Sequence, residues 1–387
     1  MSTNIFLVAG EASADLAAAS LVREVKKLVP GATFYGVGGK RLIEQGMEVV
    51  VPAESLNVVG LSDWWDRAKD VLLSYRKILK VIEQRKPDIA VLIDLPDFNL
   101  RVAKKLKKLG VPVVYYVSPQ LWAWRKNRIK LIKERVDEML VVFPFEKEIY
   151  EKAGISVSFV GHPLVELVQP RRRYRDQAVI EKEPRIALLP GSRKSEIRHH
   201  APILRGLIDL IKKEYPKAQI RVPIANTLST SWVSEKIGLK PAEVSEDSWE
   251  TLQWADVAVV ASGTATLETA LIGTPFCLFY KVSPSSSWLF RNLIKYQGFI
   301  GMPNILLGRE VVKECFQENA SPQKLFSEIK FMINSGLSRL NMASSLLSCR
   351  QLLGEKGDQT RAASRVVENL KKSRAISNQG SYGSPRS

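Results

Sequence analysis

The chain of 387 residues has no apolar run that approaches the roughly 20 residues a helix needs to cross a bilayer. Its first expected strand begins at residue 4, so no basic segment precedes an apolar one, as it would in a secretory signal peptide. We therefore expect a cytoplasmic protein without a transmembrane helix.

Cysteine and histidine are scarce, with three residues of each. Cys277, Cys315 and Cys349 have no ligand spacing, and two of the histidines are neighbours. This pattern predicts reduced thiols, no disulfide framework and no metal site. The dinucleotide fingerprint G-x-G-x-x-G is also missing, because the first expected strand is followed by Gly10-Glu11-Ala12-Ser13-Ala14-Asp15. A nicotinamide enzyme is thus disfavoured, and we expect no cofactor.

Acidic residues are outnumbered by basic ones, which gives a formal net charge of +17. Nucleic acid, an anionic membrane surface or phosphorylated substrates would each suit this charge. No zinc finger, RNP pattern or glycine-lysine loop is visible, so we expect no nucleic-acid partner. Charge alone does not separate a membrane from a phosphorylated substrate.

Short apolar segments alternate with helical patterns along most of the chain, which predicts parallel, doubly wound sheets. The pattern occurs in two successive halves, so we expect two α/β domains with a ligand cleft between them. The expected strands are residues 5–9, 32–37, 88–93, 112–117, 138–143 and 157–160, then 185–189, 219–222, 256–261 and 275–279.

The domain boundaries follow from breaks in this alternation. We expect an N-terminal domain at residues 1–165, a polar linker at 166–184 and a second domain at 185–350. A C-terminal helix at 351–373 is expected to pack back on the first domain. The last residues, 374–387, are poor in apolar side chains and are predicted to be disordered.

The run from Ser262 to Glu268 follows the apolar segment 256–261 and precedes a helical pattern. A strand, a tight turn of small residues (Ser262, Gly263, Thr264) and a helix would aim backbone N–H groups at a phosphate. Thr266 belongs to the same turn, and Glu268 is placed to bind ribose hydroxyls. The competing interpretation, a capped helix with Glu268 near its N-terminal dipole, has about equal weight.

A second corner suited to phosphate follows residues 185–189. Gly191 and Ser192 offer backbone and hydroxyl donors there, and Arg193 offers a planar fork that fits a diphosphate. Glu196 is placed to hold Arg193. The two corners belong to the same predicted domain and support each other.

Two carboxylates follow the apolar strand at 88–93. Asp94 and Asp97 would both lie at the carboxyl end of that strand, where one is a candidate general base. Asp97 or Asn99 is also suited to capping the next helix, so Asp94 is the preferred base. His162 is a further acid, base or phosphate-contact candidate, although a structural role suits it better.

An amphipathic pattern extends from Leu61 to Lys80. Its apolar positions include Trp64, Trp65, Val71 and Leu72, with basic residues between them. Such a helix either lies in an anionic membrane interface or covers a core, and the sequence favours neither strongly.

Eight motifs, in order along nearly the whole chain, make the sequence resemble the lipid-A-disaccharide synthase family. They are Gly10-Glu11-Ala12-Ser13-x-Asp15, Asp94-x-Pro-Asp97-Phe-Asn99, Tyr116-Val117-Ser118-Pro119-Gln120-x-Trp122-Ala123-Trp124-Arg125, Pro144-Phe145-Glu146, Phe159-Val160-Gly161-His162-Pro163, Leu188-Leu189-Pro190-Gly191-Ser192-Arg193, Ala261-Ser262-Gly263-Thr264-Ala265-Thr266-Leu267-Glu268 and Pro303-Asn304-Ile305-Leu306. One departure is Ala14, where the family usually has glycine; it affects the expected geometry of the first loop.

The resemblance implies an inverting GT-B glycosyltransferase, with two Rossmann-like domains facing a central cleft. The enzyme would transfer diacylglucosamine from UDP-2,3-diacylglucosamine to 2,3-diacylglucosamine 1-phosphate (lipid X), giving a β-1,6-linked disaccharide 1-phosphate and UDP. The resemblance makes Asp94 the base candidate and puts the nucleotide on the second domain. The implied donor residues are Gly191, Ser192, Arg193, Ser262, Gly263, Thr264, Thr266, Glu268 and Asn304. The implied acceptor or cleft residues are Glu11, Ser13, Asp15, Asp97, Asn99 and His162.

The resemblance also gives the helix from Leu61 a role in collecting acylated substrates at the anionic inner leaflet. The protein would then be peripheral on the inner face of the inner membrane, and a homodimer with exchanged C-terminal parts fits the family. Two alternatives stay open. One is another GT-B UDP-sugar enzyme, such as a UDP-GlcNAc 2-epimerase. The other is a non-catalytic lipid- or nucleotide-binding homologue, against which the retained Asp94 and Arg193 argue.

Overall fold

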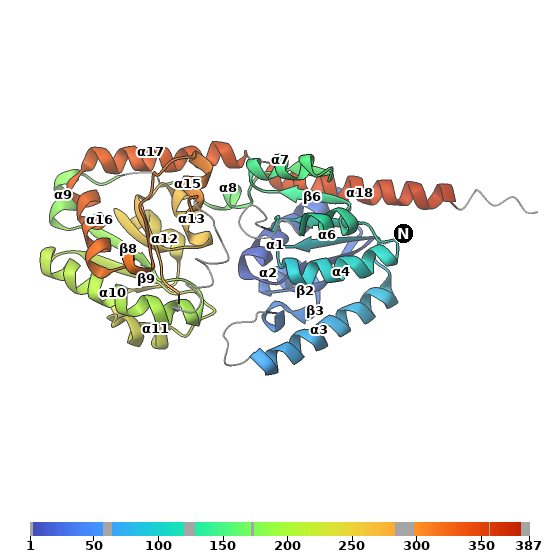
Figure 1. The fold of residues 1–387 in the computed structure, drawn as a ribbon, viewed down its shortest axis with the longest axis horizontal. Coiled ribbons are helices and arrows are strands. Elements are labelled where there is room, and N and C mark those ends of the chain that lie inside the picture. The colour runs from blue at the N-terminus through green and yellow to red at the C-terminus, as the bar shows by residue number, and fades with distance from the viewer. Residues whose placement is uncertain are drawn as a thin grey trace, which may run out of the picture. The chain divides into compact units, whose positions relative to one another are not determined.

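The computed structural model describes residues 3–56, 64–119, 128–171, 174–282, 298–355 and 357–380. The chain forms two compact units, each built on one parallel sheet covered by helices (Figure 1). Unit 1 takes residues from both ends of the chain, 1–166 and 353–387, and unit 2 comprises 167–352. The predicted fold class, two doubly wound α/β domains, is therefore confirmed.

Unit 1 contains a sheet of seven strands in the order β3-β2-β1-β4-β5-β6-β7. All neighbouring strands are parallel, and β1 pairs with β4 in a register that sets Val8 opposite Leu92. The strands are β1 (Thr3–Ala9), β2 (Ala32–Gly38), β3 (Glu48–Pro52), β4 (Ile89–Ile93), β5 (Val113–Tyr116), β6 (Glu138–Val141) and β7 (Val157–Phe159). The helices are α1 (Ala12–Leu28), α2 (Lys40–Glu44), the 3-10 turn η1 (Ala53–Leu56), α3 (Trp64–Arg85), α4 (Pro96–Lys108), α6 (Arg128–Arg135), α7 (Pro144–Lys152), α8 (Leu164–Leu167) and α18 (Asp358–Gly380).

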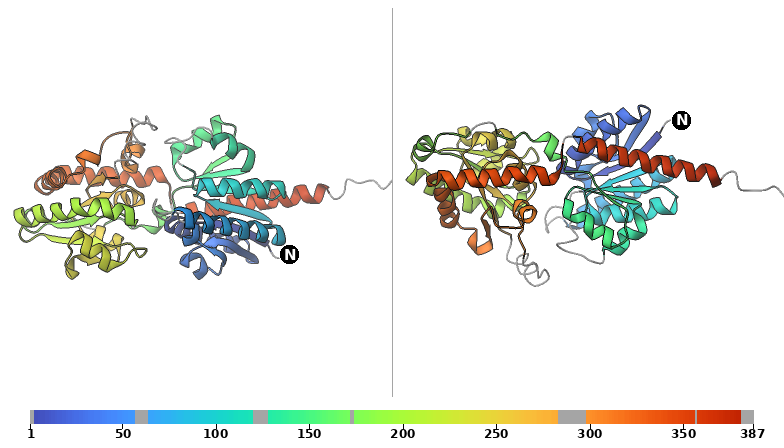
Figure 2. Two further views of the ribbon diagram at one scale, coloured as in Figure 1. Left: turned by 60° about the horizontal axis from the view of Figure 1, so that its bottom comes forward. Right: turned by 90° about the horizontal axis from the view of Figure 1, so that it is seen from above.

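Both faces of this sheet are covered, as its continuous apolar strands require. One face packs under α3, α4, α6 and α7, and the helix residues in this core include Ile78, Ile82 and Leu106. On the other face α18 lies along α1 (Figure 2). Glu138 of β6 helps to hold α18, because its buried carboxylate accepts hydrogen bonds from Arg365 and Asn369. The C-terminal helix thus completes unit 1.

Unit 2 contains a parallel sheet of six strands in the order β10-β9-β8-β11-β12-β13. The strands are β8 (Arg185–Leu189), β9 (Gln219–Pro223), β10 (Val244–Ser245), β11 (Val257–Ala261), β12 (Phe276–Tyr280) and β13 (Glu314–Phe316). The helices are α9 (Gln177–Lys182), α10 (Lys194–Glu214), α11 (Thr230–Ile237), α12 (Ser248–Trp254), α13 (Thr264–Ile272), α15 (Met302–Leu307), α16 (Pro322–Asn334) and α17 (Gly336–Leu353), with 3-10 turns η2 (Pro241–Glu243) and η3 (Gln317–Asn319).

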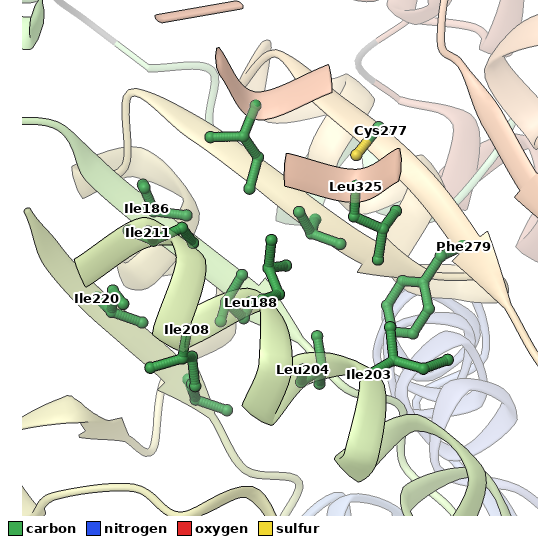
Figure 3. Close-up of a cluster of buried hydrophobic side chains, with 14 of the residues drawn as sticks. Ile186, Leu188, Ile203, Leu204, Ile208, Ile211, Ile220, Cys277, Phe279 and Leu325 are labelled. Atoms are coloured by element: carbon green, nitrogen blue, oxygen red, sulfur yellow. The ribbon is translucent and has the colours of Figure 1, made fainter. Parts of the chain in front are cut away.

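The core of unit 2 lies between the sheet and the helices α10 and α16. Figure 3 shows its aliphatic side chains, among them Ile186 and Leu188 of β8 and Ile208 and Ile211 of α10. Local sequence signals fix the ends of other helices in unit 2. Asp247 accepts from the N–H groups of Trp249 and Glu250 at the start of α12, and Gly273 ends α13 in the left-handed conformation.

Two segments differ from the boundaries expected from the sequence. Residues 167–184 of the expected linker belong to unit 2, because α9 packs against it and buries Ile180 in its core. The C-terminal helix begins at Asp358 and continues to Gly380, past residue 373, where a disordered tail was expected to follow. Among the described residues, no helix combines the length and the hydropathy that a membrane crossing requires.

Candidate active site

The strand order of each sheet reverses at one point, and ligands of doubly wound folds bind at the carboxyl ends of the strands there. In unit 1 this point lies between β1 and β4, which are followed by residues 10–15 and 94–99. In unit 2 it lies between β8 and β11, which are followed by residues 190–193 and 262–266. All four segments were selected from the sequence as candidate ligand loops.

The corner after β8 is organised by Glu196. Its carboxylate oxygen Oε2 accepts from the backbone N–H of Ser192 at 3.0 Å and of Arg193 at 3.2 Å, and Oε1 lies 3.6 Å from Nη1 of Arg193. Gly191 has a φ of +105°, and a Cβ there would meet Glu196 Oε2 at 2.5 Å. The backbone donor of Ser192, which the sequence suggested for a ligand, is therefore used inside the protein. The Ser192 hydroxyl and the half-exposed Arg193 guanidinium are the groups at the surface.

The corner after β11 is the beginning of α13. Gly263 holds φ 147° and ψ −162°, a conformation available to glycine, and no atom lies within 4 Å of where its Cβ would be. Ser262 is half-buried and Thr264 is exposed in the first turn of the helix. The first-turn N–H groups of a helix have no intrahelical acceptors, so this end of α13 suits an anion. Glu268 is half-buried one turn further on.

Two of the predicted donor residues make hydrogen bonds within unit 2. Thr266 is 2% exposed, and its hydroxyl donates to the Gly263 carbonyl at 2.8 Å. Asn304 is fully buried, and its amide binds the backbone of Val311 and Val312 and the Glu314 carboxylate. These bonds use the two donors and both acceptor sites of the Asn304 amide. Both residues stay predicted donor residues, and the structure shows that each also makes hydrogen bonds within unit 2.

The corner after β4 holds Asp94 in an unusual backbone conformation. Asp94 has φ 51° and Leu95 has φ 42°, in the left-handed region that costs a side-chain-bearing residue free energy. Asn99 is fully buried, and its Nδ2 donates to the carbonyls of Ile93 at 3.1 Å and Asp94 at 2.7 Å. The Tyr115 hydroxyl also donates to the Asp94 carbonyl. Asn99 therefore helps to fix the Asp94 backbone.

The second carboxylate of this corner, Asp97, has a different environment. It lies in the first turn of α4 with its side chain 71% exposed, and it pairs with Arg128 at 2.6 Å. Asp94 is half-buried. Two neighbouring carboxylates that differ in burial also differ in how readily they ionise, so they can take different chemical roles.

The loop after β1 and the residue His162 complete the predicted acceptor set. Glu11 is half-buried and Ser13 is exposed, but Asp15 is buried and accepts from the N–H groups of Gly39 at 2.7 Å and Arg41 at 3.0 Å. His162 Nδ1 accepts from the Leu164 N–H at 3.2 Å, and burial lowers the pKa of its imidazole to about 3. His162 is thus neutral at physiological pH. Asp15 and His162 thus both accept hydrogen bonds from backbone N–H groups within unit 1.

Comparisons with known proteins match nearly the whole chain to one family. A family model described as lipid-A-disaccharide synthetase matches residues 5–367. The chain belongs to the lipid-A-disaccharide synthase family. The lipid-A-disaccharide synthase of Myxococcus xanthus (strain DK1622) is 40% identical over 373 residues, which cover 95% of this chain and 97% of that relative. That of Syntrophus aciditrophicus (strain SB) is 39% identical over 378 residues, with 95% and 98% covered.

Solved structures with the same fold have much lower sequence identity. A UDP-GlcNAc 2-epimerase from Neisseria meningitidis bound to UDP-GlcNAc has a TM-score of 0.63 at 11% identity, covering 95% of this chain and 100% of that one. MurG from Acinetobacter baumannii has a TM-score of 0.54 at 12% identity, covering 95% and 99%. These likenesses support the GT-B fold.

Membership in the lipid-A-disaccharide synthase family confirms the function and the enzyme class expected from the sequence. The protein is a glycosyltransferase of lipid A biosynthesis that forms the lipid A disaccharide, and the family uses a UDP-sugar donor and a lipid-type acceptor. The epimerase and the non-catalytic homologue are not favoured.

One residue of the family motif 144–146 gains a definite role from the structure. Glu146 is 1% exposed at the start of α7, and its Oε2 accepts from the Phe143 N–H at 3.4 Å. Burial raises the pKa of its carboxyl to about 8. The sequence signal was present, a glutamate at the third position of a helix that begins with proline, but its burial and its hydrogen bond with the distant Ser118 depend on the tertiary fold.

The expected membrane helix corresponds to α3, which begins at Trp64 and ends at Arg85. Leu61 lies outside the described residues, and so do the side chains of Trp64 and Trp65. Val71 is half-buried, whereas Leu72 and Leu73 are 47% and 59% exposed. The helix therefore carries adjacent exposed leucines in addition to the apolar side that it buries in unit 1.

Proposed function

We propose that Asp94 is the general base of this glycosyltransferase and that the UDP-sugar diphosphate binds at Arg193 and the beginning of α13. The donor is UDP-2,3-diacylglucosamine and the acceptor is 2,3-diacylglucosamine 1-phosphate. Unit 2 carries the donor and unit 1 the acceptor. The observation that supports the proposal best is the strained backbone of Asp94, whose carbonyl accepts hydrogen bonds from Asn99 and Tyr115. Strain of this kind is retained mainly at functional sites.

The chemistry is a single displacement with inversion at the anomeric carbon. The acceptor 6-hydroxyl oxygen forms a bond to C1 of the donor sugar, its proton passes to the Asp94 carboxylate, and the bond between C1 and the phosphate oxygen breaks. The developing oxocarbenium character resembles that of glycosidases. The charge that develops on the leaving UDP is stabilised by Arg193 and by the N-terminal end of α13. Ser192, Ser262, Gly263, Thr264 and Glu268 form the rest of the proposed donor site.

Substitution of Asp94 tests the base assignment, with Asp97 as its matched control. Asp94→Asn should lower kcat by about 100-fold or more while UDP affinity and the melting temperature stay unchanged, because only proton removal is lost. Asp97→Asn removes an exposed carboxylate three residues away and should change kcat little. Turnover would be measured with radiolabelled lipid X. A large loss in Asp97→Asn with normal turnover in Asp94→Asn would transfer the role to Asp97.

We further propose that the enzyme is peripheral on the inner face of the inner membrane, with Leu72, Leu73 and the basic residues of α3 at the anionic surface. Exposed leucines on a helix that is also rich in lysine and arginine support this placement. The homodimer with exchanged C-terminal parts, implied by the resemblance, stays a proposal that light scattering of the purified protein would test.

A further inference from the structure

His200 connects two loops of unit 2 that follow different strands. It lies in the second turn of α10 and is fully buried. Its Nδ1 lies 2.7 Å from the Pro190 carbonyl oxygen, and its Nε2 lies 3.2 Å from the Lys281 N–H. A carbonyl oxygen only accepts, so Nδ1 carries the imidazole proton and Nε2 accepts from Lys281. Both ring nitrogens of the neutral side chain are therefore engaged.

These two bonds bridge strands that are not neighbours. Pro190 follows β8 and Lys281 follows β12, and β11 lies between these strands in the sheet. The imidazole therefore spans the carboxyl end of β11, from which the corner at 262–266 begins. On the other side, the Ser262 N–H donates to the Phe279 carbonyl at 3.0 Å. One connected set of contacts thus runs from Pro190 through His200 and the end of β12 to Ser262.

The surroundings of the ring keep it in one place. It packs against the rings of Phe279 at 4.7 Å and Tyr280 at 5.4 Å between centroids. The charged or titratable groups that face it are Glu196 and His199 on α10, together with the adjacent Tyr280. Burial lowers the pKa of the His200 imidazole, so the neutral form that can accept from Lys281 is the form present at neutral pH.

We infer that His200 is a positioning residue that holds the corner at Arg193 and the corner at Gly263 at the spacing that binds the diphosphate of the donor. This inference rests on the proposed donor site, because it assigns His200 a role only if both corners bind UDP. His200 itself is buried and does not contact the ligand. The geometric support is that the two contacts of His200 join the loops after two different strands.

The test separates positioning from packing with three variants. His200→Phe keeps a ring in the core but removes both hydrogen bonds, His200→Gln keeps an amide there, and His199→Phe is the control on the partly exposed neighbouring residue. The dissociation constant of UDP would be measured by calorimetry, and KM would be measured separately for donor and acceptor. We expect His200→Phe to weaken UDP binding and raise the donor KM by about 10-fold, with the acceptor KM unchanged. His200→Gln should recover part of this loss, and His199→Phe should match the wild type.

A folded His200→Phe with wild-type UDP affinity would overturn the inference. Arg193→Ala in the same assay shows whether the donor site itself is assigned correctly. If its UDP affinity is also unchanged, the proposed donor site is wrong; if its affinity falls, only the inference about His200 is wrong. If neither His200 variant folds, nitrogen NMR of the wild-type protein decides. A neutral His200 protonated at Nδ1, with a signal that shifts on UDP addition, supports positioning, whereas a proton on Nε2 or a signal indifferent to UDP contradicts it.

Discussion

Two residues of the proposed site have backbone conformations that are rare for residues with a side chain. Asp94 in unit 1 and Gly263 in unit 2 both have positive φ, and they lie one and two residues after the end of a strand at the point where strand order reverses. Asp94 has a side chain, so its conformation depends on the hydrogen bonds to its carbonyl from Asn99 and Tyr115. Gly263 needs no such support, because it has no Cβ.

Gly263→Ala isolates the backbone effect at the donor corner. No atom lies within 4 Å of the added Cβ, so the cost comes from the φ of 147° and not from a clash. We expect unfolding free energy to fall by about 1–3 kcal/mol and UDP affinity to fall with it as the first turn of α13 shifts. Gly31→Ala is the control, since it also meets open space but its φ lies outside the positive range. Denaturant unfolding and calorimetry measure both effects, and equal stabilities of the two variants would contradict the prediction.

At the scale of elements, α3 has two sets of apolar residues with opposite environments. Ile78 and Ile82 are fully buried in unit 1, whereas Leu72 and Leu73 are about half exposed. Replacing Leu72 and Leu73 together by serine should reduce flotation with anionic vesicles and leave the melting temperature within a few degrees of the wild type, because little buried surface is lost.

Ile78→Ser is the matched control within the same helix. It creates a polar cavity in the core and should lower the unfolding free energy by at least about 2 kcal/mol. If the Leu72/Leu73 double variant binds vesicles as the wild type does, α3 does not contact the membrane through these leucines and its role is structural.

The elements that the sequence predicted well are those with strong local signals. Strands β1, β4, β8 and β11 are short apolar runs that are buried on both faces, and the sequence located them within two residues. It missed β3, β10 and β13, which are edge or very short strands whose formation depends on a neighbouring strand. A pairing partner far along the chain leaves no local pattern.

The site was predicted in part for the same reason. The loops after β4, β8 and β11 were identified because polar or small residues follow an apolar strand there, and the loop after β1 was identified from the resemblance to the family. The internal hydrogen bonds of Asp15, Asn99, Thr266 and Asn304 were not identified, because a polar side chain in a motif looks the same whether it faces a ligand or a buried backbone group. Glu196 was anticipated as a partner of Arg193, since one helical turn separates them.

At the scale of the whole molecule, the buried Glu146 and the partly buried His162 of unit 1 make stability depend on pH with opposite signs. Burial raises the pKa of Glu146 to about 8, so the folded state binds a proton that the unfolded state releases above its ordinary pKa of 4.5. Stability from Glu146 is therefore lost as pH rises from 4.5 through 8. The pKa of His162 is lowered to about 3 from 6.5, so its contribution is lost as pH falls below 6.5. The two effects cancel between pH 4.5 and 6.5.

Glu146→Gln should separate these contributions. The variant lacks the titrating carboxyl, so its unfolding free energy relative to the wild type should rise with pH between 5 and 8, by up to about 1.4 kcal/mol per pH unit. Below pH 4.5 the difference should be constant. Denaturant unfolding at a series of pH values, followed by a signal from unit 1, measures it. A difference that does not change with pH would show that the Glu146 carboxyl ionises normally in the folded protein.

The assembly of unit 1 from both ends of the chain has a consequence for biosynthesis. The ribosome makes the seven strands of unit 1 first, then all of unit 2, and only afterwards α18. At about 5–20 residues per second, the interval is on the order of ten seconds or more. During that time the nascent sheet lacks α18, whose residues Val366 and Leu370 are buried in the folded unit and which packs beside α1. Unit 2 can thus finish folding before unit 1 is complete, and a chain that stops short of Asp358 lacks a helix of its N-terminal unit rather than of its C-terminal one.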